Sequence, residues 1–189
     1  MAGLLAAVVI GLPVATAAQQ NASGWAAELV ALRFVSKSGA SVALARAFKD
    51  FASTRAAGPP VPSAMWFDSA RGLVEVCFEQ VPDQQANCGY RVVLLARDLA
   101  PPPSASAKSV TGSPLGLSYA RLLAKFHADD HLARKNIVRG ADGTVVFVSA
   151  EDEDPPPARY DHGPQSYLFQ DYFLRDGIVV AYAYKATEN

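Results

Sequence analysis

Cysteine is scarce in this chain of 189 residues, which has only Cys77 and Cys88. Two cysteines at this spacing match no zinc-binding pattern. The sequence also has no glycine-rich phosphate loop, dinucleotide-binding fingerprint, C-x-x-C redox motif or paired-carboxylate motif. Charge is almost balanced, with a net value of -1, so the chain lacks the basic surface that nucleic acid or an anionic membrane would require. We therefore expect no cofactor and no nucleic-acid partner.

Charged side chains are also missing from the first 18 residues. The apolar run Gly3–Ile10 is followed by the helix breaker Pro13 and by the small residues Ala15–Ala18, an order typical of a cleavable signal peptide. A retained membrane anchor is the alternative, but a span requires about 20 apolar residues, and this run is shorter. We expect residues 1–18 to be removed, which leaves no stable membrane anchor and a periplasmic or secreted protein.

The two cysteines lie in a segment typical of a hairpin. The runs Leu73–Glu79 and Gly89–Leu95 have strand character, and the residues between them, Val81–Asn87, are typical of a loop. Exported proteins retain disulfides, so an even number of cysteines in this context predicts a Cys77–Cys88 bridge. Chain-entropy arithmetic for so short a loop gives about 3 kcal/mol of stabilisation.

The order of the predicted elements indicates a single α+β domain over residues 19–189. We expect an antiparallel sheet built from hairpins, with two or three helices packed on one face. Prolines and small polar residues predict mobile loops near residues 100–114 and 150–165. The patterns predict helices at 24–37, 41–54 and 118–134, a strand near 65–67, and hairpins at 73–95, 136–148 and 166–185. Within the first of these helices, a strand at residues 29–35 is the alternative.

The last hairpin has the clearest local signal, because Asp176–Gly177 is a preferred two-residue turn. Counting outward pairs Phe173 with Val180 and Asp171 with Tyr182. This register places Asp171 on an aromatic face of the sheet. If that face is covered, a buried carboxylate is a candidate binding residue. If the face is open, Asp171 simply reaches water.

The most chemically loaded stretch contains His127, Asp130 and His131. Two histidines four positions apart lie on one side of a helix and can bind a transition metal, with a carboxylate or His162 completing the site. The stretch has no H-E-x-x-H motif, and ordinary solvated helix residues explain it equally well. A metal-assisted hydrolase is therefore one alternative function.

A run of four acidic residues precedes three prolines, and it consists of Glu151, Asp152, Glu153 and Asp154. Several carboxylates can attract Ca²⁺, but the spacing is not that of an EF-hand loop. The run can also serve as an electrostatic docking patch for a basic partner.

Taken together, the sequence favours an exported binding protein without catalysis, with a protein as its partner. Inhibitors and immunity-type proteins share its size, its predicted single disulfide and its near-neutral charge. This comparison rests on analogy with a class of proteins. Two alternatives stay open. One is the metal-assisted hydrolase, and the other is a carrier whose apolar pocket lies behind the C-terminal hairpin and takes a small apolar ligand.

Overall fold

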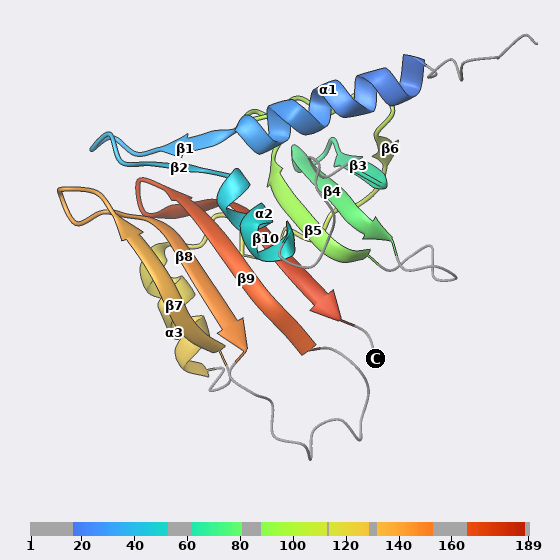
Figure 1. Cartoon of the computed structure of the whole chain (residues 1–189). Coiled ribbons are helices and arrows are strands. Elements are labelled where there is room, and N and C mark those ends of the chain that lie inside the picture. The colour runs from blue at the N-terminus through green and yellow to red at the C-terminus, as the bar shows by residue number, and fades with distance from the viewer. Residues whose placement is uncertain are drawn as a thin grey trace, which may run out of the picture.

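The computed structural model describes residues 17–52, 62–80, 88–112, 114–128, 132–152 and 166–187 (Figure 1). It has three helices, α1 (Ala17–Ala31), α2 (Ala45–Ala52) and α3 (Tyr119–Ala128). Its strands are β1 (Arg33–Val35), β2 (Ser41–Ala43), β3 (Ala64–Asp68), β4 (Leu73–Gln80), β5 (Cys88–Leu95), β6 (Ser106–Ala107), β7 (Leu132–Arg139), β8 (Val145–Asp152), β9 (Ser166–Arg175) and β10 (Ile178–Thr187). None of the described helices has the length and apolar character of a membrane span.

Eight of the strands form one open sheet in the order β6-β3-β4-β5-β10-β9-β8-β7, and β1 pairs with β2 as a separate hairpin. Neighbouring strands run antiparallel except β3 and β6, which are parallel. The fold is therefore mostly β, with an antiparallel sheet built largely from hairpins as the alternating patterns predict. The Cys77–Cys88 disulfide is present and joins β4 to β5.

The predicted hairpins are confirmed, whereas the predicted helix boundaries are wrong in three places. The first helix ends at Ala31, and residues 33–35 form β1 instead of continuing to residue 37. The second helix begins at Ala45, because residues 41–43 pair with β1. The third helix ends at Ala128, and residues 132–134, expected to be helical, belong to β7. In each case strand pairing overrides a helical pattern in the local sequence.

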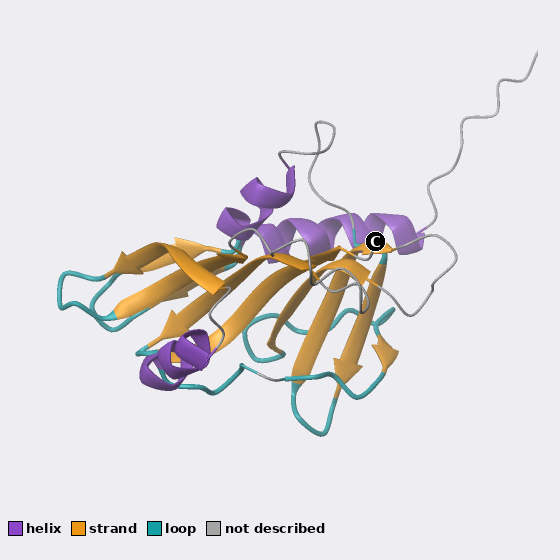
Figure 2. Cartoon of the chain, turned by 90° about the horizontal axis from the view of Figure 1, so that it is seen from below, coloured by secondary structure: helices purple, strands orange, loops and turns teal. Residues whose placement is uncertain are grey.

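The sequence predicts two or three helices on one face of the sheet. Two of the helices do share a face, but the third lies on the opposite face. Figure 2 shows α1 and α2 on one side of the sheet and α3 on the other. Trp25 and Leu29 of α1 and Phe48 of α2 belong to one core cluster, whereas Leu122 and Phe126 of α3 belong to a second one. We call the side covered by α1, α2 and the β1–β2 hairpin the first face, and the side covered by α3 the second face.

The turn of the last hairpin is confirmed, but its register is wrong beyond the first pair. Asp176 and Gly177 both have positive φ, 51° and 76°, as this turn requires. Val179 pairs with Leu174 as predicted, and a bulge at Val180 then shifts the register by one residue.

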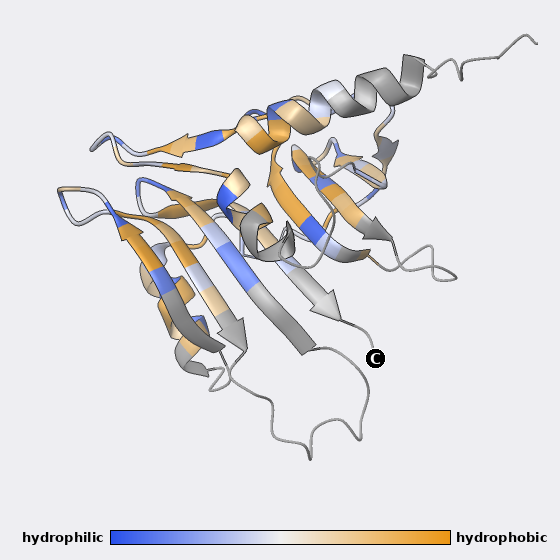
Figure 3. Cartoon of the chain, viewed as in Figure 1, coloured by the Kyte–Doolittle hydropathy of each residue, from blue (hydrophilic) through white to orange (hydrophobic). Residues whose placement is uncertain are grey.

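The shift separates residues that the sequence placed on one face. Asp171 lies opposite Ala183 instead of Tyr182. Phe173 and Ala183 therefore belong to the first-face cluster, and Tyr182 belongs to the second-face cluster. Figure 3 shows a hydrophilic band on β9, and similar bands on β4, β5 and β7 interrupt the apolar strands of the sheet.

Candidate functional site

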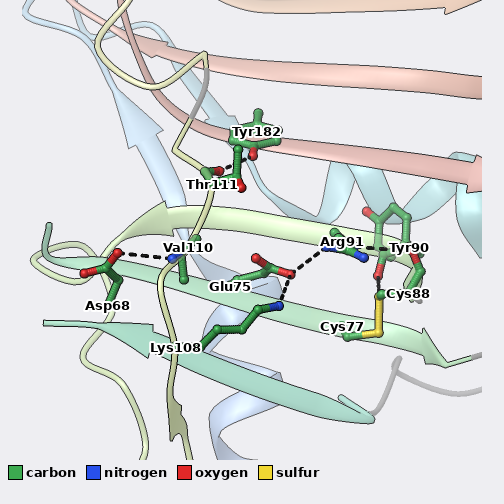
Figure 4. A network of polar contacts seen from close by, with 10 residues as sticks. All are labelled: Asp68, Glu75, Cys77, Cys88, Tyr90, Arg91, Lys108, Val110, Thr111 and Tyr182. Atoms are coloured by element: carbon green, nitrogen blue, oxygen red, sulfur yellow. Dashed lines mark hydrogen bonds and ion pairs between the residues drawn. A yellow bond between two sulfur atoms is a disulfide. The ribbon is translucent and has the colours of Figure 1, made fainter. Parts of the chain in front are cut away.

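The second face is crossed by residues 106–112 and 114–117, which we call the crossing segment and which have no helix or strand after β6. It begins as β6 at the edge of the sheet, where Ser106 pairs with Trp66 of β3. It ends beside β10, where the Gly116 N–H donates to the Val179 carbonyl and the Val179 N–H donates to the Leu117 carbonyl. Figure 4 shows its first part passing over β4 and β5. This route brings residues from the predicted loop 100–114 against the C-terminal hairpin.

Two side chains at the β3–β4 turn hold the backbone of the crossing segment at Val110. The Val110 N–H donates to Asp68 Oδ2 at 3.1 Å, and the Val110 carbonyl accepts from Arg71 Nη1 at 3.1 Å. The backbone N–H of Arg71 also donates to Asp68 Oδ1. The hydrogen bond from Val110 lowers the pKa of the Asp68 carboxyl below its ordinary value, and the Arg71 hydrogen bond and charge act in the same direction. Asp68 is therefore a carboxylate at neutral pH.

Two further contacts position the middle of the segment. The Tyr182 hydroxyl of β10 donates to the Thr111 carbonyl at 2.8 Å. Burial raises the pKa of the Tyr182 phenol, so the hydroxyl keeps the proton that it donates. At the next residue the chain passes so close to β4 that a Cβ on Gly112 would lie 2.7 Å from Leu73 Cδ1. Glycine at this position permits the close approach.

The buried carboxylate of Glu75 on β4 forms an ion pair with the crossing segment through Lys108. Its Oε1 lies 3.0 Å from Arg91 Nη1 of β5 and 3.9 Å from Lys108 Nζ of the crossing segment (Figure 4). The Lys108 ammonium also lies 4.1 Å from the centre of the Trp66 ring, in cation–π geometry. Since Glu75 is only 3% exposed, these two cations compensate a charge that would otherwise be costly to bury.

Beyond the contacts of Glu75, an open cleft of about 530 Å³ lies between the crossing segment and the sheet. The cleft lies where β10 changes partner: residues 181–185 pair with β5, and residues 178–179 bond to the crossing segment instead. Its lining is mainly apolar and comes from four separate parts of the chain, namely Arg71, Leu73, Leu95, Arg97, Thr111, Gly112, Leu115, Gly116, Ile178, Val179 and Val180.

Both charged residues that line the cleft are arginines, and no lining residue is acidic. Arg71 has Asp68 as a neighbour, with Nε 3.9 Å from Oδ2, and remains 59% exposed. Arg97 is exposed and makes no hydrogen bond or ion pair within the described part of the chain. The acidic residue nearest to Arg97 in sequence is Asp98, which already forms an ion pair with Arg175, with Oδ1 2.8 Å from Nη2. The cleft therefore combines a mainly apolar lining with one arginine, Arg97, that has no acidic partner among the described residues.

Asp171 does not line this cleft and lies on the first face of the sheet, opposite Ala183 of the first-face cluster. Its side chain is fully buried, with Ala183 on one neighbouring strand and Ser149 on the other. The sequence left open whether Asp171 lies on a covered face or reaches water. The side chain is on a covered face and does not reach water. A binding role for Asp171 stays a prediction.

Most of the other predicted site residues lie outside the described part. Asp130, His131, Glu153 and Asp154 are not described, nor is His162. His127 lies in the last turn of α3, and Glu151 and Asp152 lie at the end of β8, but their side chains are not described. Among described residues no group of three potential metal ligands gathers. The metal and calcium interpretations thus stay predictions.

Sequence reasoning did not find the residues of the cleft. Arg71, Arg97 and Thr111 stand in turns and loops that carry no recognisable motif, and only the predicted pocket behind the last hairpin points toward this place. Comparison with protein-family models, with curated proteins and with solved structures gives no match for this chain. Function must therefore be inferred from the cleft itself.

Proposed function

We propose that this chain is an exported binding protein and that the cleft beside the crossing segment takes a small, mainly apolar molecule. The observation that carries the proposal is the cleft of about 530 Å³ with Leu73, Leu95 and Leu115 in its lining. Ligand pockets have volumes of about 300–1,000 Å³ and are lined mainly by apolar side chains with few polar groups. The lining here has that composition.

The contacts around the cleft support binding to a preformed site. Asp68, Arg71, Glu75 and Tyr182 hold the crossing segment at successive points before it reaches the cleft. A wall that is already ordered loses little conformational entropy when a ligand binds. Ile178 is 40% exposed at the cleft, so a ligand can cover apolar surface that water otherwise contacts.

The disulfide supports the export part of the proposal. A structural Cys77–Cys88 bridge persists in the periplasm or outside the cell and is reduced in most cytoplasms. When the full chain is produced in bacteria, we expect the mature protein to be recovered outside the cytoplasm with an N-terminus near Gln19. N-terminal sequencing checks this, and an intact start at Met1 would contradict export.

A variant that fills the cleft tests the binding part. Thr111 is exposed, and its carbonyl, which is retained on substitution, accepts the Tyr182 hydrogen bond. We expect Thr111→Trp to lower the affinity for the uncharged apolar dye Nile red about tenfold, measured by fluorescence titration, because the indole occupies cleft volume. Ser109→Trp is the matched control, since Ser109 is exposed on the same segment and does not line this cleft.

A second variant guards against a folding defect in the first. Ile178→Asn removes exposed apolar surface from the cleft and should also weaken Nile red binding, while circular dichroism reports an unchanged fold. Equal Nile red affinity in wild type, Thr111→Trp and Ile178→Asn would show that the cleft is not the binding site. A protein partner, the function first favoured by the sequence, would then be the hypothesis to pursue by pull-down.

A further inference from the structure

We infer that the ligand of this cleft is an amphipathic acid, a small molecule with an apolar body and one carboxylate or phosphate group that Arg97 recognises together with Arg71. The inference rests on the proposed function and specifies the ligand of the same site. Its basis is charge: two guanidinium groups line the cleft, and no acidic side chain does.

The arginines of the sheet differ sharply in how they are compensated. Arg91 pairs with Glu75 at 3.0 Å, and Arg175 pairs with Asp98 at 2.8 Å. Arg97 lies in the turn that follows β5 and has no such partner among the described residues, although Asp98 is its neighbour in sequence. An acidic group bound in the cleft would supply the missing counter-charge.

Guanidinium groups suit this recognition better than ammonium groups do. The planar fork of an arginine side chain binds a carboxylate or a phosphate through two parallel hydrogen bonds. Arg71 donates to the Val110 carbonyl and has the Asp68 carboxylate 3.9 Å away, so its charge is already partly compensated and it has a secondary part in recognition. Arg97 has its donors available and is the residue that contacts the acid.

The apolar part of the lining accounts for the rest of the ligand. Leu73 and Val179, which belong to the second-face cluster, are buried at the base of the cleft, and Ile178 in its lining is 40% exposed. A free inorganic anion would leave the exposed side chain of Ile178 in contact with water. A single molecule with both properties satisfies the apolar lining and the arginines at the same time, and this favours an amphipathic acid over a simple salt.

Four ten-carbon probes that differ only in their head group test the inference. Decanoate, decyl phosphate, uncharged 1-decanol and cationic decylamine compete with Nile red for the purified mature protein at low ionic strength. We expect the two acids to bind about tenfold more tightly than 1-decanol, and decylamine to bind least. The ratio of decanoate to decyl phosphate identifies which acidic group the site prefers.

Substitution of Arg97 connects this preference to the cleft. Arg97→Gln should lower the affinity for the preferred acid about tenfold and leave that for 1-decanol unchanged, whereas Arg97→Lys should retain part of the preference. Arg121→Gln is the matched control, because Arg121 is exposed on α3 and lines no part of the cleft. Added salt should weaken the acids and not the alcohol.

The outcomes separate the two proposals. If 1-decanol and both acids compete equally well, the acid inference fails while an apolar binding site stands. If neither Nile red nor any probe binds, the proposed function fails as well. A preference for decylamine, or an acid preference that survives Arg97→Gln, overturns the assignment to Arg97.

Discussion

The two faces of the sheet are covered in different ways. On the first face, α1, α2 and the β1–β2 hairpin bring aromatic and aliphatic side chains against the strands, with Phe34 and Phe147 both in ring contact with Phe173. On the second face, α3 covers one part, and the crossing segment covers the other through the buried side chain of Val110 and through polar contacts to Asp68, Glu75 and Tyr182. One face is therefore closed by packing, while part of the other is covered by a hydrogen-bonded segment.

This difference explains where a cleft can exist. Close-packed apolar layers leave few voids larger than a water molecule. A segment held by separated hydrogen bonds and ion pairs can bridge over the strands without filling all the space beneath it. The cleft lined by Leu73 and Val179 stays open for this reason. The comparison implies that stability resides mostly in the first face and binding in the second.

The strongest test of this division is a large cavity in the first face. Phe173 is fully buried between Phe34 and Phe147, with ring centres at 5.0 and 5.2 Å. We expect Phe173→Ala to lower the free energy of unfolding by about 4 kcal/mol, from lost apolar burial and the cavity that remains. Urea denaturation followed by circular dichroism measures the loss. Ile137→Ala, at an exposed apolar side chain, serves as the control and should change stability little.

A smaller loss is expected on the second face at the buried ion pair. Glu75→Gln keeps the shape of the side chain and removes the charge that compensates Arg91 and Lys108. Because Arg91 is only 21% exposed, we expect a loss of about 2 kcal/mol in the free energy of unfolding. The same urea titration measures it, with Glu28→Gln on the exposed side of α1 as the control. A loss as large as that of Phe173→Ala would contradict the division between the faces.

Local patterns in the sequence account for the strands and not for the assembly. Alternation in residues 73–79 and the Asp176–Gly177 turn identify hairpins, because those signals arise between residues close in sequence. The sequence predicts the short strand β1 only as the alternative at residues 29–35 and does not predict β2, since three-residue strands exist only through mutual pairing. The bulge at Val180 escapes too, and it alone decides that Asp171 and Tyr182 face opposite sides.

The cleft could not be predicted from local sequence patterns for the same reason. Arg71, Arg97, Thr111 and Ile178 come together through strand order and through the path of the crossing segment. Composition marked residues 100–114 as a loop and gave no reason to place it on the sheet. Only the disulfide and the predicted pocket behind the last hairpin connect sequence reasoning to this side of the molecule.

The smallest expected effect concerns the anchor at Asp68 and sharpens the comparison through pH. The Val110 N–H lowers the pKa of Asp68 in the folded protein, while the unfolded chain has the ordinary value of about 3.9. The contribution of this carboxylate is therefore complete above that value and is lost as the pH falls through the lower folded-state pKa. Asp68→Asn cannot show this loss, because it does not titrate.

We accordingly expect the stability difference between wild type and Asp68→Asn to be constant from pH 7 to about pH 5 and to shrink as the pH falls below about 4. Other titrating carboxylates, such as Asp142, whose pKa the Thr144 N–H lowers in the same way, are present in both proteins and cancel in the difference. The Val110 amide should also exchange its hydrogen faster in Asp68→Asn at neutral pH. The amides of α1 and of the β1–β2 hairpin, which cover the first face, should keep their protection. A difference that is independent of pH, or a loss of protection on both faces, would mean that Asp68 supports the whole fold and not only the crossing segment.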